Sequence, residues 1–471
     1  MFDHNKKQFD DKGKPQEIVG RKTTGPINYK FLFGQLSYRI NMNKLIKRIC
    51  LLTGICSTVL FFISFNLPSL AQEASDYDSL IVVPKEKSAY SKRMGRVLAK
   101  RGILKYQKIK DNIYVIHLDK NDKEAKITEL QESGLFELVE PDYKLVLNEM
   151  PTERVYTKIT VLSKENKNPD PEVLETKEIT PNDKGFGSQY YLREINATKA
   201  WSTTVGNSLL VGILDTGVDQ NHPDLAGKVT AGTDNPDYDL NDQIGHGTEV
   251  AGIIAANTNN NLGIAGISWN TKVLSLRITD DVGQARVSTV VKALEDAYNK
   301  GAKIVQISLS TNQFSHTLRD SIQQAQDRGI LVVSTAGNTG VSELRYPAAF
   351  DGVIGVGATN QAKEIESYST RGEHVDLVAP GTSVYTTSAY SSYETVTGTS
   401  FSSPQIAGAA ALVWSIVPTL TNEEVSEILI NSADDLGDPG KDEKYGNGIL
   451  NIEKAVKLAK EKKEELEEQN E

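Results

Sequence analysis

Short apolar runs alternate with amphipathic stretches over the second half of the chain. The apolar runs predict buried β-strands at 209–214, 273–278, 304–309, 330–334 and 353–356. The amphipathic stretches predict helices at 248–256, 288–300, 317–328 and 402–416. Nearly continuous apolar strands separated by helices are typical of a parallel sheet covered by helices on both faces. The pattern therefore predicts a large α/β domain over residues 182–452.

A second pattern precedes this domain. Residues 79–147 are expected to form strand, helix, two strands, helix and strand, at 79–83, 88–101, 103–109, 112–118, 122–133 and 135–140. This βαββαβ order predicts a small ferredoxin-like α+β domain. Residues 148–181 are polar and contain several prolines, which indicates a linker that includes a processing region. Residues 453–471 predict a charged helical tail, which we interpret as solvated.

The N-terminal part of the chain carries a targeting pattern. An apolar run at 49–65 follows three basic residues and precedes small residues. This order is typical of a secretory signal peptide, here 42–71, and predicts a secreted protein. The alternative is a retained membrane anchor with the folded domains on the outer side, because the run is close to spanning length. Residues 1–41 form a polar extension, and we hypothesise that translation begins at Met42.

Charge and cysteine content narrow the function classes. The 471-residue chain has a net charge of −10, with 52 basic and 62 acidic residues. Since 11 of the basic and 4 of the acidic residues precede residue 72, the rest carries 41 against 58, a net charge of −17. An acidic body argues against a nucleic-acid partner. Both cysteines, Cys50 and Cys56, lie in the N-terminal apolar run, so the downstream chain has no disulfide and no thiolate metal site.

Four polar residues stand at predicted strand ends or helix starts. Asp215 and Asn338 follow apolar strands, His246 lies between two glycines before a helix, and Ser400 precedes the helix at 402–416. Taken alone, Asp215, His246 and Ser400 are more often structural residues of turns or helix starts, and Asn338 could equally be a turn residue. Together they supply the hydroxyl, base, carboxylate and oxyanion donor that acyl transfer needs.

These residues stand in four motifs, 211–217 (VGILDTG), 245–248 (GHGT), 335–338 (TAGN) and 398–404 (GTSFSSP). The motifs closely resemble those of the subtilisin-like serine proteases, whose known triad order is Asp, His, Ser. The resemblance covers 182–452, and the loops are most similar to thermitase-type members. It implies a subtilisin-like α/β fold and a serine endopeptidase that forms an acyl-enzyme.

The resemblance also assigns roles. It implies that Ser400 is the nucleophile, His246 the base and Asp215 the residue that orients it, and that Asn338 helps to bind the oxyanion. It further implies that residues 79–147 are an inhibitory propeptide, so that the protein is a self-processing zymogen and its own propeptide a partner. The chain departs from the family at two places, with Glu249 where His is usual and Gln-Ile after Pro404 where His-Val is usual.

Other readings of the motifs remain. A catalytically inactive subtilisin-like scaffold that binds peptides is the main alternative, and the presence of all four motif residues favours the enzyme. A nucleotide-binding protein is disfavoured because no strand-to-helix turn carries the G-x-x-x-x-G-K-[ST] loop.

Substrate contacts are implied by the same resemblance. Polypeptide substrates would pair as a strand with two backbone edges of the enzyme. These edges are the segments Val282, Gly283, Gln284 and Ser308, Leu309, Ser310. Arg345 directly precedes Tyr346-Pro347, which implies a place near the base of the primary specificity pocket and a preference for acidic side chains. The alternative is that Arg345 points into solvent or pairs with Glu343.

A structural calcium ion is also implied, while no catalytic cofactor is expected. Hard cations take carboxylate, amide and carbonyl oxygens, and the Asn-rich loop at 257–264 is rich in them. The implied ligands are the side chains of Asp183, Asp224 and Asn260 and the carbonyls of Asn257, Leu262 and Ile264. The alternative is a polar turn without an ion.

Overall fold

The structure of the chain is a computed structural model that describes residues 78–85, 93–118, 123–147, 177–232 and 241–469. The predicted extension at 1–41, the predicted signal peptide at 42–71 and most of the predicted linker therefore lie outside the described residues. Among the described helices, none combines the length and the apolar character that crossing a bilayer requires.

A parallel sheet of seven strands organises the large domain (residues 177–469). Its order is β14-β13-β12-β10-β6-β8-β7, and every neighbouring pair is parallel. The strands are β6 (Leu210–Asp215), β7 (Val229–Ala231), β8 (Lys272–Arg277), β10 (Ile304–Ile307), β12 (Leu331–Thr335), β13 (Ile354–Thr359) and β14 (Leu377–Pro380). Five of them match the predicted apolar runs, whereas the short β7 and the edge strand β14 were not predicted.

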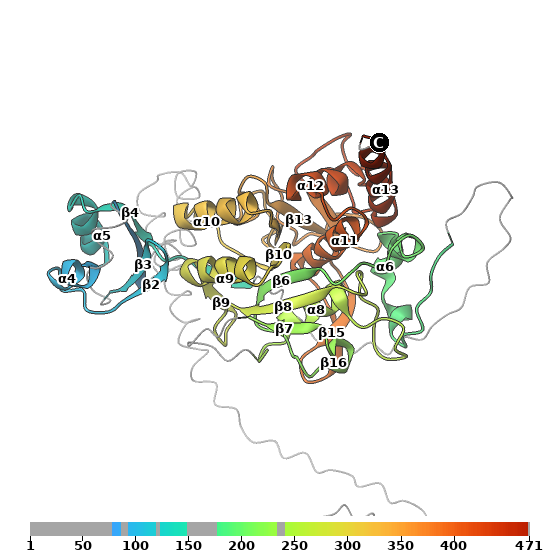
Figure 1. Ribbon diagram of the computed structural model, residues 1–471, viewed down its shortest axis with the longest axis horizontal. Helices are drawn as coiled ribbons and strands as arrows, with labels where there is room; N and C mark the ends of the chain where they lie inside the picture. Colours follow the sequence, from blue (N-terminus) through green and yellow to red (C-terminus); the bar gives the residue numbers. More distant parts are fainter. Residues whose placement is uncertain (1–77, 86–92, 119–122, 148–176, 233–240, 470–471) are drawn as a thin grey trace, which may run out of the picture. The chain divides into compact units, whose positions relative to one another are not determined.

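Helices cover both faces of this sheet, as Figure 1 shows for α9 and α10 on one side and α11 on the other. The helices are α8 (His246–Ala255), α9 (Val287–Asn299), α10 (His316–Asp327) and α11 (Ser403–Ile416). Val211 and Ile213 of β6 join the cluster that includes α8 and α11, whereas Leu214 joins the cluster that includes α9 and α10. The strand is apolar throughout because both of its faces are buried. The predicted α/β fold is confirmed.

The C-terminal tail corrects one interpretation. Helix α13 (Ile452–Glu468) buries Ile452, Ala455, Val456 and Ala459, which join the large core cluster. These positions follow the i, i+3, i+4, i+7 spacing of one helix face, so the first two turns belong to the core. The interpretation of the whole tail as solvated was wrong for this half of the helix.

The small domain (residues 78–147) has the predicted order of elements. These are β1 (Ser79–Pro84), α4 (Met94–Ala99), β2 (Tyr106–Lys110), β3 (Ile113–His117), α5 (Lys123–Glu132) and β4 (Phe136–Pro141). The strands form an antiparallel sheet in the order β2-β3-β1-β4. Leu80 and Val82 on one face of β1 pack with Leu98 of α4 and Leu130 of α5. Ile81 on the other face belongs to a cluster with α9 and α10.

Candidate active site

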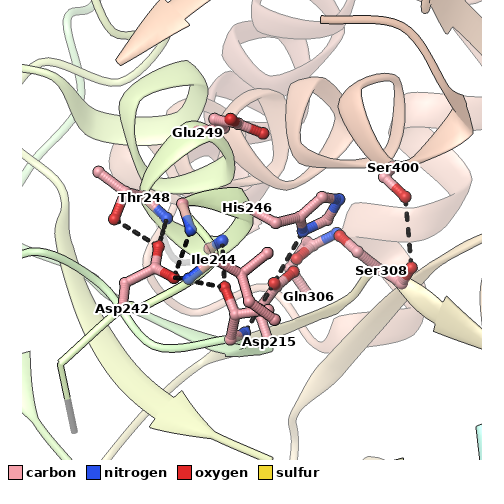
Figure 2. A network of polar contacts seen from close by, with 12 residues as sticks. Asp215, Asp242, Ile244, His246, Thr248, Glu249, Gln306, Ser308 and Ser400 are labelled. Carbon is pink, nitrogen blue, oxygen red and sulfur yellow. Dashed lines mark hydrogen bonds and ion pairs between the residues drawn. The ribbon is translucent and has the colours of Figure 1, made fainter. Parts of the chain in front are cut away.

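The carboxyl edge of the parallel sheet brings two of the predicted residues together. Asp215 is the last residue of β6, and His246 is the first residue of α8. The Oδ1 atom of Asp215 lies 2.7 Å from Nδ1 of His246, and both side chains are buried (Figure 2). A buried carboxylate at this distance fixes the imidazole so that Nε2 is directed away from it.

Asp242 holds the start of helix α8 and was missed by the sequence analysis. Its carboxylate accepts hydrogen bonds from the hydroxyl of Thr216 at 2.8 Å, the backbone of Gly245 at 2.7 Å, and both the backbone and hydroxyl of Thr248 at 2.9 and 2.6 Å. These contacts tie the residue after Asp215 to the residues on both sides of His246; Figure 2 shows Asp242 beside Thr248 and the start of α8. The available signal was an Asp four positions before a helix-start His, which favours local backbone hydrogen bonding.

Glu249 lies one helical turn after His246 and is 7% exposed. Burial raises the pKa of this carboxyl to about 8, although the nearby His246 works in the opposite direction. The hydroxyl of Ser388 donates to its Oε1 at 3.2 Å. The residue that departs from the family pattern is thus a protonated carboxyl at neutral pH and adds no charge beside the base.

Ser400 lies in a 3-10 turn directly before α11. Its Oγ donates to the carbonyl of Ser308 at 3.3 Å and not to His246, as Figure 2 shows. The next residue, Phe401, packs its ring at 5.2 Å from the imidazole of His246. The structure therefore contains the Asp215–His246 contact, whereas the hydroxyl of Ser400 is bonded to Ser308. Catalytic hydrogen bonds are often incomplete without a substrate.

Asn338 follows the turn after β12 and faces the segment that precedes Ser400. Its Oδ1 accepts from the backbone and the hydroxyl of Thr399 at 3.0 and 2.7 Å. Its Nδ2 would lie 3.2 Å from a Cβ atom placed on Gly398. Because the amide oxygen is taken by Thr399, the amide nitrogen is the atom that can face a reacting carbonyl beside Ser400.

The two predicted backbone edges meet one extended segment. Strand β5 (Lys144–Leu147) pairs antiparallel with β11 (Leu309–Ser310) on one side and with β9 (Gln284–Arg286) on the other. The backbone N–H of Leu147 also donates to the carbonyl of Gly283 at 3.1 Å. This is the pairing expected of a peptide bound as a strand. Gly283 and Gln284 take part in it, whereas the Val282 side chain is 75% exposed at the rim.

Arg345 lies under β11 and is 6% exposed. Its Nε and Nη2 donate to the hydroxyl of Ser310 at 3.3 and 3.2 Å, and its Nη1 lies 3.4 Å from Oε1 of Glu343. The side chain therefore pairs with Glu343, which was one of the two alternatives. It is buried against β11 and does not point into solvent.

The implied calcium ligands gather at one loop. Asp183 accepts from the backbone of Asn259 and Asn260 at 2.9 and 3.1 Å. Asp224 accepts from Nδ2 of Asn260 and the backbone of Ile264, both at 2.7 Å. Burial raises the pKa of Asp183, and the charge of Asp224 adds to this effect. Two buried carboxylates with only neutral donors form a place that a cation would stabilise.

Two details of this loop differ from the implied ligand set. The side-chain oxygen of Asn260 accepts from the backbone of Leu262 at 2.8 Å, so its amide must turn to offer oxygen to an ion beside Asp224. The carbonyl of Leu262 accepts from the backbone of Lys184 at 3.0 Å. Within the described part of the chain, no three His, Cys, Asp or Glu side chains form a metal cluster, so an ion here depends on amide and carbonyl oxygens.

Comparison with known proteins agrees with the geometry. The model of the subtilase family matches residues 206–448. A thermophilic serine proteinase from Bacillus sp. (strain AK1) is 36% identical over 72% of this chain and 86% of the relative. Thermitase from Thermoactinomyces vulgaris is 38% identical over 59% of this chain and 99% of the relative. Subtilisin BL from Lederbergia lenta is 36% identical over 54% and 92%.

Proposed function

Because the chain belongs to the subtilase family and is a subtilisin-like serine endopeptidase, we propose that Asp215, His246 and Ser400 are its catalytic triad and that it is made as a self-processing zymogen. The buried Asp215–His246 contact of 2.7 Å at the sheet edge supports the triad. The strand β5, held between β9 and β11, supports the zymogen, because it occupies the edges on which a substrate would pair.

The reaction follows from these positions. Ser400 Oγ attacks the scissile carbonyl while His246 Nε2 takes its proton, which gives a tetrahedral intermediate. His246 then passes this proton to the leaving amine, and the acyl-enzyme remains. Water attacks the ester through the same proton transfers, which releases the acid and restores Ser400. Asp215 keeps the imidazole in one tautomer and stabilises its charged form.

Asn338 stabilises the charge that develops on the substrate oxygen. Its Nδ2 and the backbone N–H of Ser400 are the donors in this proposal, and the anchoring of its oxygen by Thr399 supports it. A donor held in place before the reaction needs no reorganisation when charge appears. The loss of one such donor lowers kcat by about 10²- to 10³-fold.

The small domain is the inhibitory propeptide in this proposal. Glu140 accepts from the hydroxyl of Ser315 at 2.8 Å and from the backbone of His316 and Thr317 at 3.0 Å each, at the start of α10. Asp142 accepts from the backbone and hydroxyl of Ser288 at 2.9 and 2.7 Å, in the first turn of α9. Carboxylates satisfy the amides of helix N-termini and are favoured by the helix dipole. These contacts hold the domain from which β5 continues.

We also propose export and a structural calcium ion. The basic, apolar and small-residue order at 42–71 supports secretion, with a retained membrane anchor as the alternative. The buried carboxylates of Asp183 and Asp224 support a calcium site that Asn260 and the carbonyls of Asn257, Leu262 and Ile264 complete. A bound ion would supply positive charge beside these carboxylates, and no step of the proposed reaction involves it.

The position of β5 carries the zymogen proposal, and the variant Ser400→Ala tests it. The purified precursor should mature by cutting within residues 148–181, whereas the variant should stay uncleaved and hydrolyse no peptide. Mass spectrometry of both proteins, each purified without other proteases, gives the result. A Ser400→Ala protein that matured to the same N-terminus would refute the triad and the self-processing together. An inactive scaffold would leave the parent protein uncleaved as well.

A further inference from the structure

One buried cation joins two segments that border the nucleophile. Arg345 donates to the hydroxyl of Ser310 on β11, and its Cγ would lie 3.1 Å from a Cβ atom on Gly337, next to Asn338. The following residue, Tyr346, pairs with Thr311 through two backbone hydrogen bonds of 2.8 and 2.9 Å. The backbone therefore anchors Arg345 between β11 and the turn that carries Asn338, the proposed oxyanion donor.

The strand register shows which substrate side chain meets this cation. Val146 of β5 lies opposite Ser310, and Leu147 opposite Leu309. A peptide continued by one residue places that residue opposite Ser308, whose carbonyl is 3.3 Å from Ser400 Oγ. This residue thus carries the carbonyl nearest to the nucleophile. Opposed residues share a face, and so do residues two apart along a strand, so its side chain lies on the Ser310 face.

The charges around this position favour an acidic side chain. Arg345 is permanently charged, and its planar group suits a carboxylate. Among the described residues, Glu343 pairs with it at 3.4 Å and is 32% exposed, which is a long and partly solvated contact. His374 lies behind the same turn, with Nε2 3.3 Å from the carbonyl of Ala336, and burial lowers its pKa. It is therefore neutral at neutral pH and does not compete for an anion.

We propose that Arg345 selects polypeptides with Glu or Asp immediately before the cleaved bond. The inference rests on the proposed function, because it takes Ser400 as the nucleophile. Ser310 orients the guanidinium through its hydroxyl, and the substrate carboxylate replaces or shares the weak contact of Glu343. A basic side chain at the same position is repelled by the buried charge.

Matched peptides that differ only at this residue test the proposal. The kcat/KM of the matured enzyme should be about 10- to 100-fold higher for Glu than for Gln, since a hydrogen bond to a charged group is strong in a buried place. Arg345→Gln should reduce this ratio to about one. Arg319→Gln removes an exposed arginine of α10 and serves as the matched control, in which the ratio is retained.

The outcomes separate this inference from the proposed function. A parent enzyme that cleaves the Leu peptide but prefers Gln or Leu to Glu would overturn the acidic preference alone, as would an unchanged ratio in Arg345→Gln. If that variant does not fold, Glu343→Gln decides: removal of the competing carboxylate should raise the Glu-to-Gln ratio several-fold, and an unchanged or lower ratio contradicts the proposal. No cleavage of any peptide or of casein by the parent would refute both.

Discussion

The two described domains bury their sheets differently. The large domain covers its parallel sheet with its own helices on both faces, α8 and α11 on one and α9 and α10 on the other. The small domain covers one face with α4 and α5, and Ile81 and Val115 on the other face join the cluster of α9 and α10. A domain with a complete core of its own can keep a catalytic site rigid, whereas the small domain completes its burial by binding.

The polar groups show the same difference. Within the large domain, Asp242 and Asp215 are bonded to neighbours from the same domain, at the site itself. In the small domain, the buried carboxylates of Glu140 and Asp142 are bonded chiefly to helix starts of the large domain. Changes in the large domain should therefore alter its own stability, whereas changes at Glu140 should alter docking.

Removal of calcium should give the largest change in stability, and only in the large domain. An ion bound by the folded state alone stabilises it by about 2.7 kcal/mol at 100 times its Kd. Thermal unfolding of the Ser400→Ala protein, which avoids self-digestion, should move to lower temperature when a chelator replaces calcium. Asp224→Asn should remove this response, while Asp320→Asn, an exposed change of the same charge, should keep it. An equal melting temperature of the Ser400→Ala protein with and without chelator would contradict the calcium site.

Replacement of Glu249 by Gln should change how the stability of the large domain depends on pH. Because burial raises the folded-state pKa to about 8, this group contributes most stability below its ordinary value of 4.5. That contribution is lost as the pH rises towards 8, by up to about 1.4 kcal/mol per pH unit. Above this pH the group no longer changes the free energy of unfolding. Between pH 5 and 8, the free energy of unfolding of the Glu249→Gln protein should rise relative to that of the parent, as measured by chemical denaturation. Parallel curves over this range would show that Glu249 is ionised in the folded protein.

Substitution of Glu140 should have the smallest effect and should act on docking alone. Loss of a helix-capping group typically lowers stability by about 1 kcal/mol. In the Ser400→Ala background, Glu140→Ala should make an added protease cut the small domain about fivefold faster, because the undocked state is more populated. The melting temperature of the large domain should not change. Glu137→Ala, at an exposed position of the same strand, is the control, and equal rates in both variants would contradict the capping role.

The buried elements could be predicted because their physical signal is local. The apolar runs at 304–309 and 330–334 contain the information that both faces of a strand are covered, and the structure has strands there. The prediction of a solvated tail was wrong for a related reason, because its many charges obscured a narrow apolar stripe from Ile452 to Ala459. The edge strand β14 was missed because a four-residue strand gives little pattern to detect.

The site was only partly accessible to the same reasoning. Asp215 and His246 could be named from strand and helix boundaries together with the family motifs, and the structure brings them into contact. The role of Asp242 depends on a hydrogen bond from Thr216, which lies 26 residues earlier in the sequence, and no periodicity records such a contact. The direction of the Ser400 hydroxyl and the burial of Arg345 under Ser310 depend on side-chain rotamers, which are set by tertiary packing.

The ring of Phe401 against His246 has a chemical consequence for durability. Peroxides attack thioether and thiol sulfur far more readily than phenyl rings, and a sulfoxide beside the nucleophile would place a polar, bulky group against the imidazole. All four methionines and both cysteines precede residue 151, at Met1, Met42, Met94, Met150, Cys50 and Cys56. If the chain is cut beyond that point, as the zymogen proposal requires, residues 151–471 contribute no sulfur atom to the enzyme. We therefore expect peroxide to inactivate this enzyme more slowly than it would a protease with a methionine beside its nucleophile.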